Sequence, residues 1–249
     1  MNGEQSLFDA ADGAPFLPLK DGSTELYLIR HADAYPDEAD VVAGGYDAQP
    51  LSSLGRCQAR ALAERLQVRE LAAIYSSPIR RAWQTAMCLG EALGLPVQER
   101  DTLRDVGLLP GPSYSEAGEA LECVRAMRAH NWSAEAAVMR AGNWSLVRGC
   151  EPSEQLRSRM TRTISDIVRL HAGQRVAIVT HSGPINAFLA ATLGLACDVF
   201  CLFDNTALSV LRVKGSDHFF LQLNDTAHLY QRCTKAMEQR TNAYAEERL

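Results

Sequence analysis

Short apolar runs bounded by turn residues recur along the chain. One spans residues 26–29, and two others span Leu71–Tyr75 and Arg175–Thr180. Runs this short that are rich in β-forming residues are typical of buried strands. We therefore expect three strands of one sheet at these places, and residues 97–103 are a weaker strand candidate.

Stretches with the apolar spacing of helices lie between and after these runs. They cover residues 52–67, 79–93, 152–170 and 184–194. Strands that alternate with helices predict a mostly parallel central sheet with helices on both faces. Near the C-terminus, Ala207–Val213 and Phe219–Leu223 flank Gly215 as the two strands of a hairpin. The expected fold class is therefore α/β, a three-layer sandwich with an antiparallel edge.

A chain of 249 residues, 47% of them hydrophobic, is long enough to bury the core of one α/β domain. Residues 1–22 form a polar lead-in with prolines, which we expect to be poorly ordered. Residues 23–249 are expected to form the single domain. Within it, residues 106–150 carry an interrupted helical pattern and predict a lid-like insertion.

The formal net charge of -5 argues against a nucleic-acid partner, because such proteins usually carry a basic surplus. No run reaches the roughly 18 apolar residues of a membrane span, so we expect no membrane partner and a cytoplasmic location. The seven cysteines are irregularly spaced and predict reduced thiols. Cys197 and Cys201 lack further ligands at a familiar spacing, so we expect core residues there and no metal site.

Basic side chains follow the expected strands. Arg30 and His31 follow the first run, Arg81 lies in the first turn of the helix after the second, and His181 follows the third. The carboxyl ends of parallel strands share one edge of the sheet, where α/β proteins bind ligands. Such a cluster suits a phosphate, which arginine grips with its planar fork and which the helix N-terminus at Ser182 can also bind. Neighbouring cations disfavour an imidazolium, so we expect a neutral His31 that can attack phosphorus.

Five segments resemble motifs of the histidine phosphatase superfamily, which includes the cofactor-dependent phosphoglycerate mutases. They are Leu28-Ile-Arg-His-Ala32, Asp47-Ala-Gln-Pro-Leu-Ser-Ser-Leu-Gly-Arg-Cys-Gln-Ala59, Tyr75-Ser-Ser-Pro-Ile-Arg-Arg-Ala-Trp-Gln-Thr-Ala86, Thr180-His-Ser-Gly-Pro-Ile185 and Asn224-Asp-Thr-Ala-His-Leu229. The resemblance implies the phosphoglycerate mutase-like fold. It also implies that His31 is the nucleophile, which becomes phosphohistidine. Arg30, Arg81 and His181 would then hold the phosphoryl oxygens, with Ser182 as a further substrate-binding residue.

The leaving alkoxide in this chemistry needs a proton. Members of the family usually supply it from a glutamate in a Leu-x-Glu segment, and here Leu103-Arg104-Asp105 occupies that place. The resemblance therefore implies Asp105 as the general acid. Glu116 in the adjacent loop and Glu151 before the long helix are rivals for this role.

Departures from the family pattern separate three candidate functions. No Trp-Asn follows Asp33, and the segment after Leu103 lacks the Glu-Arg-His-Tyr run of the mutases, which favours a phosphatase. The leading hypothesis is a metal-independent phosphomonoesterase that acts on a small phosphorylated substrate without a cofactor. A phosphoglycerate mutase-type phosphotransferase is the second. A binding or scaffold member of the fold that has lost catalysis is the third. The sequence holds no signal for the physiological substrate or the oligomeric state.

Overall fold

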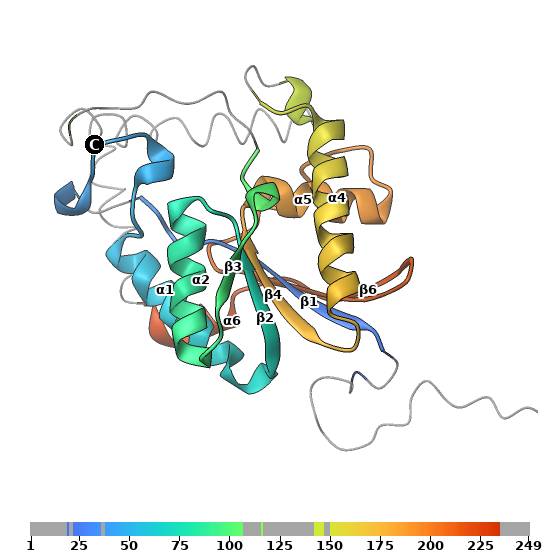
Figure 1. Cartoon of the computed structure of the whole chain (residues 1–249). Coiled ribbons are helices and arrows are strands. Elements are labelled where there is room, and N and C mark those ends of the chain that lie inside the picture. Colours follow the sequence, from blue (N-terminus) through green and yellow to red (C-terminus); the bar gives the residue numbers. More distant parts are fainter. Residues whose placement is uncertain are drawn as a thin grey trace, which may run out of the picture.

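The structure, a computed structural model, describes residues 19, 22–35, 38–106, 116, 142–146 and 150–234. Among these residues, six strands form one sheet in the order β3-β2-β4-β1-β5-β6 (Figure 1). The strands are β1 (Thr24–Arg30), β2 (Leu71–Ser76), β3 (Val97–Glu99), β4 (Arg175–Thr180), β5 (Leu208–Lys214) and β6 (Asp217–Asp225). The α-helices are α1 (Ser53–Leu66), α2 (Arg80–Leu93), α4 (Ser153–Leu170), α5 (Ser182–Leu193) and α6 (Ala227–Arg232). Short 3-10 helices occupy Glu38–Asp40, Tyr46–Ala48, Gln67–Arg69, Asp101–Leu103 and Trp144–Leu146.

The strand directions confirm a mostly parallel sheet with an antiparallel edge. β1 pairs in parallel with β4, β4 with β2, and β2 with β3. On the other side of β1, β5 and β6 are antiparallel to their neighbours and form the expected hairpin. The three strands that precede the predicted basic residues, β1, β2 and β4, are therefore adjacent and point the same way.

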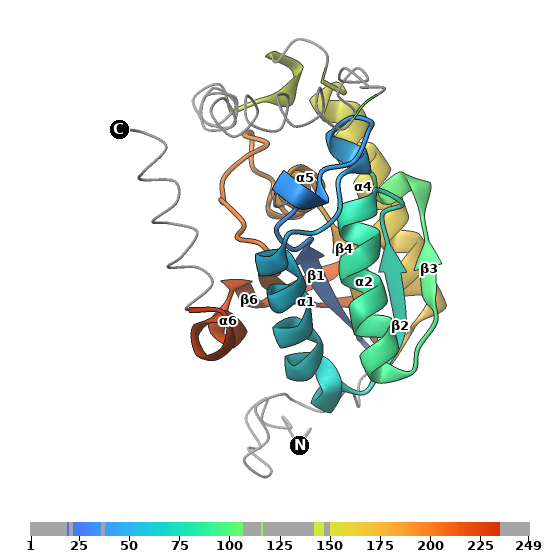
Figure 2. The same cartoon turned by 90° about the vertical axis from the view of Figure 1, so that its left-hand side faces the viewer.

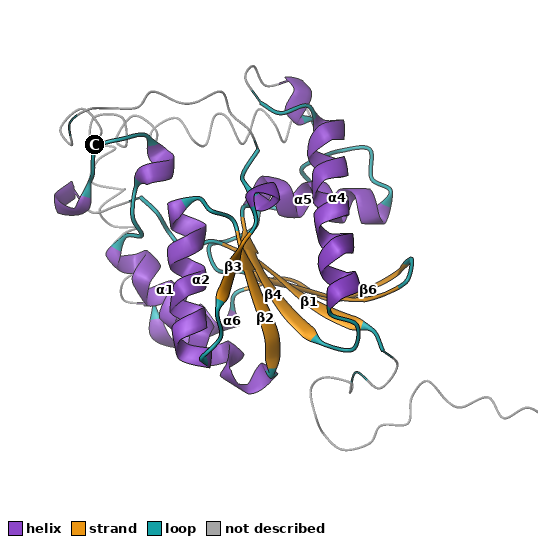
Figure 3. Cartoon of the chain, viewed as in Figure 1, coloured by secondary structure: helices purple, strands orange, loops and turns teal. Residues whose placement is uncertain are grey.

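Helices cover both faces of this sheet, so the predicted three-layer sandwich is confirmed (Figure 3). The helices α1 and α2 lie on one face, and α4 and α5 lie on the other (Figure 2). Leu26 and Leu28 of β1 pack with residues of α4 and α5, whereas Tyr27 and Ile29 pack with residues of α1 and α2. Successive side chains of a strand point to opposite faces, so β1 is buried on both sides.

Helix ends follow the local chemistry of the chain. Ser52 caps α1, because its hydroxyl accepts from the backbone N–H of Gly55 at 2.9 Å. The helix α2 ends at Gly94, whose φ of 65° is the left-handed conformation that closes helices. The cap of α1 also holds the loop after β1 in place, since Ser52 donates its hydroxyl proton to the Asp33 carboxylate.

Two predicted elements differ from the structure or lie partly outside it. The strand candidate over 97–103 stops at Glu99, because a 3-10 turn begins at Asp101. Residues 1–22 and 106–150 fall mostly outside the described residues, so the lead-in, the insertion and the domain limits stay predictions. No helix among the described residues is both long and apolar enough to cross a membrane.

Candidate active site

The carboxyl ends of three neighbouring strands bring the predicted basic residues together. β1 ends at Arg30, β4 ends one residue before His181, and β2 leads to the first turn of α2, which contains Arg81. The backbone N–H of His31 donates to the carbonyl of Thr180 at 2.9 Å, so the two histidines follow paired strand ends. This edge is where parallel α/β sheets bind ligands.

Two contacts hold the buried His31 imidazole in one tautomer. Its Nδ1 lies 2.7 Å from the carbonyl oxygen of Ala32, which can only accept, so Nδ1 carries the proton. Arg81 donates from Nε to Nε2 of His31 at 3.1 Å, so Nε2 presents its lone pair. The Nε2 atom is therefore the nucleophilic position of this side chain.

The second histidine lies edge-on to the first. The ring centroids of His31 and His181 are 5.1 Å apart, and Nε2 of His181 lies 2.9 Å from the Ser77 hydroxyl. Among the described residues, Nδ1 of His181 and Nε of Arg30 are buried without a hydrogen-bond partner. Buried polar atoms are normally paired, so these two nitrogens indicate a place for a polar ligand.

Both histidines are neutral at neutral pH. Burial, followed by the charge of Arg81, holds the pKa of His31 well below its usual value. The same two causes, in the same order, lower the pKa of His181. Because the positive charge at this site resides on guanidinium groups, the unprotonated imidazole of His31 is available for attack on an electrophile.

Asp105 reaches the same cluster from the loop after β3. Its Oδ2 accepts from Nη2 of Arg81 at 2.9 Å and lies 3.4 Å from Nδ1 of His181. Its Oδ1 accepts from the backbone N–H of Val106 at 2.9 Å, which fixes the carboxylate in a tight local turn. Of the three acidic candidates, Asp105 is the one that the structure joins to Arg81 and His181.

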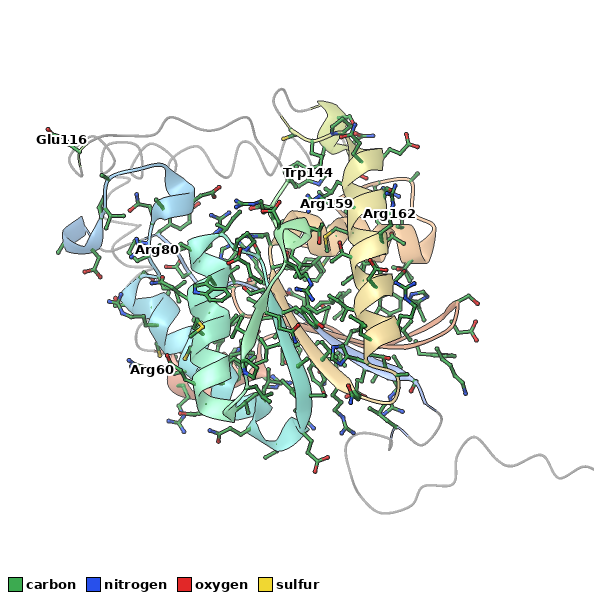
Figure 4. The ribbon with its side chains drawn as sticks, viewed as in Figure 1. Arg60, Arg80, Glu116, Trp144, Arg159 and Arg162 are labelled. Carbon is green, nitrogen blue, oxygen red and sulfur yellow. The ribbon has the colours of Figure 1, made fainter. Side chains whose placement is uncertain are left out.

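The rival carboxylates have other surroundings. Glu151 forms an ion pair with Arg159 at 2.6 Å. Arg159 in turn donates to the carbonyl oxygens of Thr102, Arg104 and Asp105, at 2.7, 3.0 and 3.3 Å. Glu151 therefore supports the loop that carries Asp105. The side chain of Glu116 lies well apart from Arg159 (Figure 4).

Ser182 begins α5 beside this loop. No side-chain contact joins Ser182 to the two histidines among those found in the described residues, so its predicted role in substrate binding stays a prediction. The next residue, Gly183, is required by space, since a Cβ there would lie 2.4 Å from Cγ2 of Val106 and 3.3 Å from the Trp144 ring. This close approach packs the loop of Asp105 against the N-terminus of α5.

Asp47 is a contact of the site that the sequence reasoning did not single out. Its Oδ1 accepts from Nη1 of Arg81 at 2.7 Å, and its side chain is 64% exposed. The only sequence signal was its place at the start of the segment before α1. In the described ranges, no group of three or more His, Cys, Asp or Glu side chains could hold a metal ion.

Two further residues missed by sequence reasoning hold the backbone of Arg30 and His31. Asn205 donates from Nδ2 to the carbonyl of His31 at 3.0 Å, and the N–H of Thr206 donates to the carbonyl of Arg30 at 3.0 Å. Thr206 is buried with a φ of 58°, a strained conformation for a β-branched residue. Its hydroxyl lies 3.0 Å from Nε2 of His228. No periodicity or motif spacing reveals such a contact.

Paired histidines at the carboxyl edge of a three-layer sheet define the phosphoglycerate mutase-like class of α/β proteins. The sequence model of the histidine phosphatase superfamily (branch 1) matches residues 26–226. The chain belongs to this superfamily, and the prediction of the family is confirmed.

Similar proteins include several phosphatases. The chain is 30% identical over 210 residues to phosphoserine phosphatase 1 of Hydrogenobacter thermophilus, covering 82% of this chain and 94% of that protein. It is 33% identical over 175 residues to glucosyl-3-phosphoglycerate phosphatase of Mycolicibacterium vanbaalenii, covering 70% and 76%. The native structure of mycobacterial glucosyl-3-phosphoglycerate phosphatase superposes with a TM-score of 0.62 at 26% identity, covering 81% of this chain and 99% of that one.

Proposed function

We propose that this protein hydrolyses small phosphate monoesters through a phosphohistidine formed on His31. The observation that carries the proposal is the orientation of its imidazole, which turns the Nε2 lone pair toward the Arg81 guanidinium. A phosphate group bound by this guanidinium would have its phosphorus atom beside Nε2 of the neutral His31 imidazole. Phosphatase activity agrees with the family of the chain and with the phosphatases among its relatives.

The first half of the reaction transfers the phosphoryl group to the protein. The guanidinium groups of Arg30 and Arg81, with His181, bind the phosphoryl oxygens and stabilise the charge that develops on them. Nε2 of His31 forms a bond to phosphorus while the bond from phosphorus to the ester oxygen breaks. Asp105, in its protonated carboxylic acid form, gives its proton to the departing oxygen, which leaves as an alcohol.

The second half returns the protein to its starting state. Asp105, now a carboxylate, takes a proton from a water molecule, whose oxygen forms a bond to phosphorus. The bond between phosphorus and Nε2 of His31 breaks, and inorganic phosphate leaves. The 5.1 Å between the two histidine ring centroids and the 3.4 Å between Oδ2 of Asp105 and Nδ1 of His181 support this sequence of steps.

A labelled phosphomonoester tests the proposal directly. We expect rapid quenching to trap acid-labile label on the wild-type protein and none on the His31→Ala variant. Turnover should persist in EDTA, because arginines, and not a metal ion, neutralise the negative charge of the bound phosphoryl group. Label in the variant equal to that in the wild type would contradict the proposal.

The substrate is expected to be a phosphate monoester of a small carboxylic acid. Phosphoserine and glucosyl-3-phosphoglycerate, which appear in the names of two relatives, share this chemistry. A panel of these compounds, 3-phosphoglycerate and neutral sugar phosphates tests it by kcat/KM. On phosphoglycerate, the ratio of hydrolysis to transfer separates a phosphatase from a mutase.

A further inference from the structure

Helix α6 lies beside α1 (Figure 2), and the two helices pack through a small apolar contact. Leu54 and Ala61 of α1 meet Leu229 and Cys233 in one buried cluster, and Cys57 packs at its border. Around the cluster, Arg65 of α1 pairs with Asp225, and Arg232 of α6 pairs with Glu64. The two cysteines therefore face each other across an interface that ion pairs hold in register.

The two sulfur atoms are unusually close. Sγ of Cys57 lies 2.7 Å from Sγ of Cys233, although the residues are 176 apart in the sequence. Non-bonded carbon atoms approach to about 3.5–4.0 Å, and sulfur is larger than carbon. A disulfide bond is about 2.05 Å long. The backbone thus already holds the two side chains in positions from which a small rotation would form the bond.

We infer that Cys57 and Cys233 are a disulfide-forming pair, an oxidation site that covalently joins α6 to α1. The reaction needs a two-electron oxidant such as a hydroperoxide. The Cys57 sulfur attacks the peroxide oxygen, becomes a sulfenic acid and releases water or an alcohol. The Cys233 sulfur then attacks Sγ of Cys57 while its thiol proton passes to the departing hydroxyl group of the sulfenic acid, which leaves as water, so that two thiols and one peroxide give one disulfide.

The surroundings of the two thiols assign these two roles. Cys57 is partly exposed, so an oxidant reaches it first, whereas Cys233 is buried. Burial, followed by the contact with Cys57, raises the pKa of Cys233 to about 12. Cys233 therefore stays a protonated thiol that is protected from the oxidant and is held beside Cys57 as its resolving partner.

Both helices that the bond would join hold the backbone around the nucleophile. On α1, Gln58 follows Cys57 and accepts from the backbone N–H of Asp33 at 2.9 Å. On α6, His228 contacts the hydroxyl of Thr206, whose N–H donates to the carbonyl of Arg30. Fixing α6 to α1 therefore secures both contacts, and the oxidised protein should keep its catalytic geometry.

Mass spectrometry of the full-length protein tests the pair. After a modest excess of hydrogen peroxide, we expect the intact mass to fall by two hydrogen atoms, and dithiothreitol to reverse the change. Peptide mapping should find Cys57 linked to Cys233. The variants Cys57→Ser and Cys233→Ser should lose the change. Cys88→Ser is the matched control and should keep it, because Cys88 has no thiol neighbour among the described residues.

Stability provides a second readout. The bond would close a loop of 176 residues and lower the conformational entropy of the unfolded chain, so we expect the melting temperature to rise by roughly 5–15 °C. Reduction should return it to the starting value. A linkage that maps to other cysteines, or a Cys57 that is oxidised or blocked without a link to Cys233, would overturn the inference. Neither result bears on phosphatase activity, so the two proposals fail separately.

Discussion

Charged groups are buried at both ends of β1, but within the described ranges, buried side-chain nitrogens without a hydrogen-bond partner are found only at the second end. At the start of the strand, Glu25 is fully buried and accepts from Tyr27 at 2.6 Å, from Arg212 at 3.0 Å and from Arg175 at 3.3 Å. This carboxylate also helps to raise the pKa of Tyr27, after burial as the larger cause. The start of β1 is therefore a closed polar cluster in which each charge has its partner.

The other end of β1 is left open. Among the described residues, the buried side-chain atoms without a hydrogen-bond partner are Nε of Arg30, Nδ1 of His181, which lies 3.4 Å from Oδ2 of Asp105, and Nε1 of Trp144. The first two belong to the site, and the Trp144 ring packs against α5 beside it. Buried charged groups that pair with one another, as around Glu25, stabilise the fold. Buried nitrogens without a hydrogen-bond partner, in a pocket lined by arginines, leave a place for an anion. We therefore expect the charged groups at the start of β1 to stabilise the fold, and those at its end to bind a ligand.

The largest expected effect comes from removing His31, the proposed nucleophile, at the open end. We expect His31→Ala to lower kcat by about 10⁴-fold, since the variant lacks the imidazole that forms the proposed covalent intermediate. Its free energy of unfolding should hardly change, because the mutation removes a polar group that folding must desolvate. Steady-state kinetics and chemical denaturation measure the two effects. A His31→Ala variant with near wild-type turnover would contradict the assignment of catalysis to this end of β1.

The second-largest expected effect tests whether Asp105 is the general acid. Asp105→Asn should lower turnover of an alkyl phosphate by roughly 10²–10³-fold, and turnover of an aryl phosphate with a good leaving group by less than about 10-fold. Asp47→Asn is the matched control, because Asp47 also pairs with Arg81. The control should affect both substrates equally. Equal losses for both substrates in Asp105→Asn would assign proton donation to another group.

At the closed end, the expected loss is one of stability. Glu25→Gln removes the buried carboxylate that the Arg175 and Arg212 guanidinium groups share, so we expect a loss of about 2–4 kcal/mol in the free energy of unfolding. The folded variant should keep its kcat. Glu70 also pairs with Arg175 but is 89% exposed, so Glu70→Gln should cost less than about 0.5 kcal/mol. A large loss of activity in folded Glu25→Gln would contradict the division between the two ends.

The cluster of basic residues at the open end could be predicted from the sequence, because most of these residues directly follow predicted strands. Arg30, His31 and His181 each lie at the point where an apolar run stops, and Arg81 lies in the first turn of the next helix. Parallel strands bring such points to one edge, so local patterns were enough to predict the cluster. The family resemblance supplied Asp105, which local patterns alone did not distinguish from Glu116 and Glu151.

Other contacts could not be predicted in this way because they join distant segments at single points. Thr206 lies in a loop before β5, and its contact with the backbone of β1 depends on an unusual φ that no residue preference signals. The proximity of Cys57 and Cys233 depends on how α6 packs on α1. The irregular spacing of the cysteines in the sequence did not indicate this pair, since spacing along the chain says nothing about distance in space.

The smallest expected effect is a pH dependence that starts from His228. Its pKa is lowered to about 4, mainly by burial and then by Arg65, whereas an unfolded histidine has a pKa of about 6.5. Between these values the unfolded chain binds a proton that the folded protein excludes. Stability is therefore complete above pH 6.5 and falls as the pH drops toward 4.

His228→Gln removes this proton and should make the loss of stability between pH 7 and pH 4.5 smaller by roughly 1–3 kcal/mol, as measured by urea denaturation. His31 and His181 shift in the same direction, so the variant should keep part of the slope. At pH 8, where His228 is neutral in both the folded and the unfolded state, the difference between the variant and the wild type reports only the lost contact with Thr206. A slope equal to that of the wild type would mean that His228 is protonated as easily in the folded protein as in the unfolded chain.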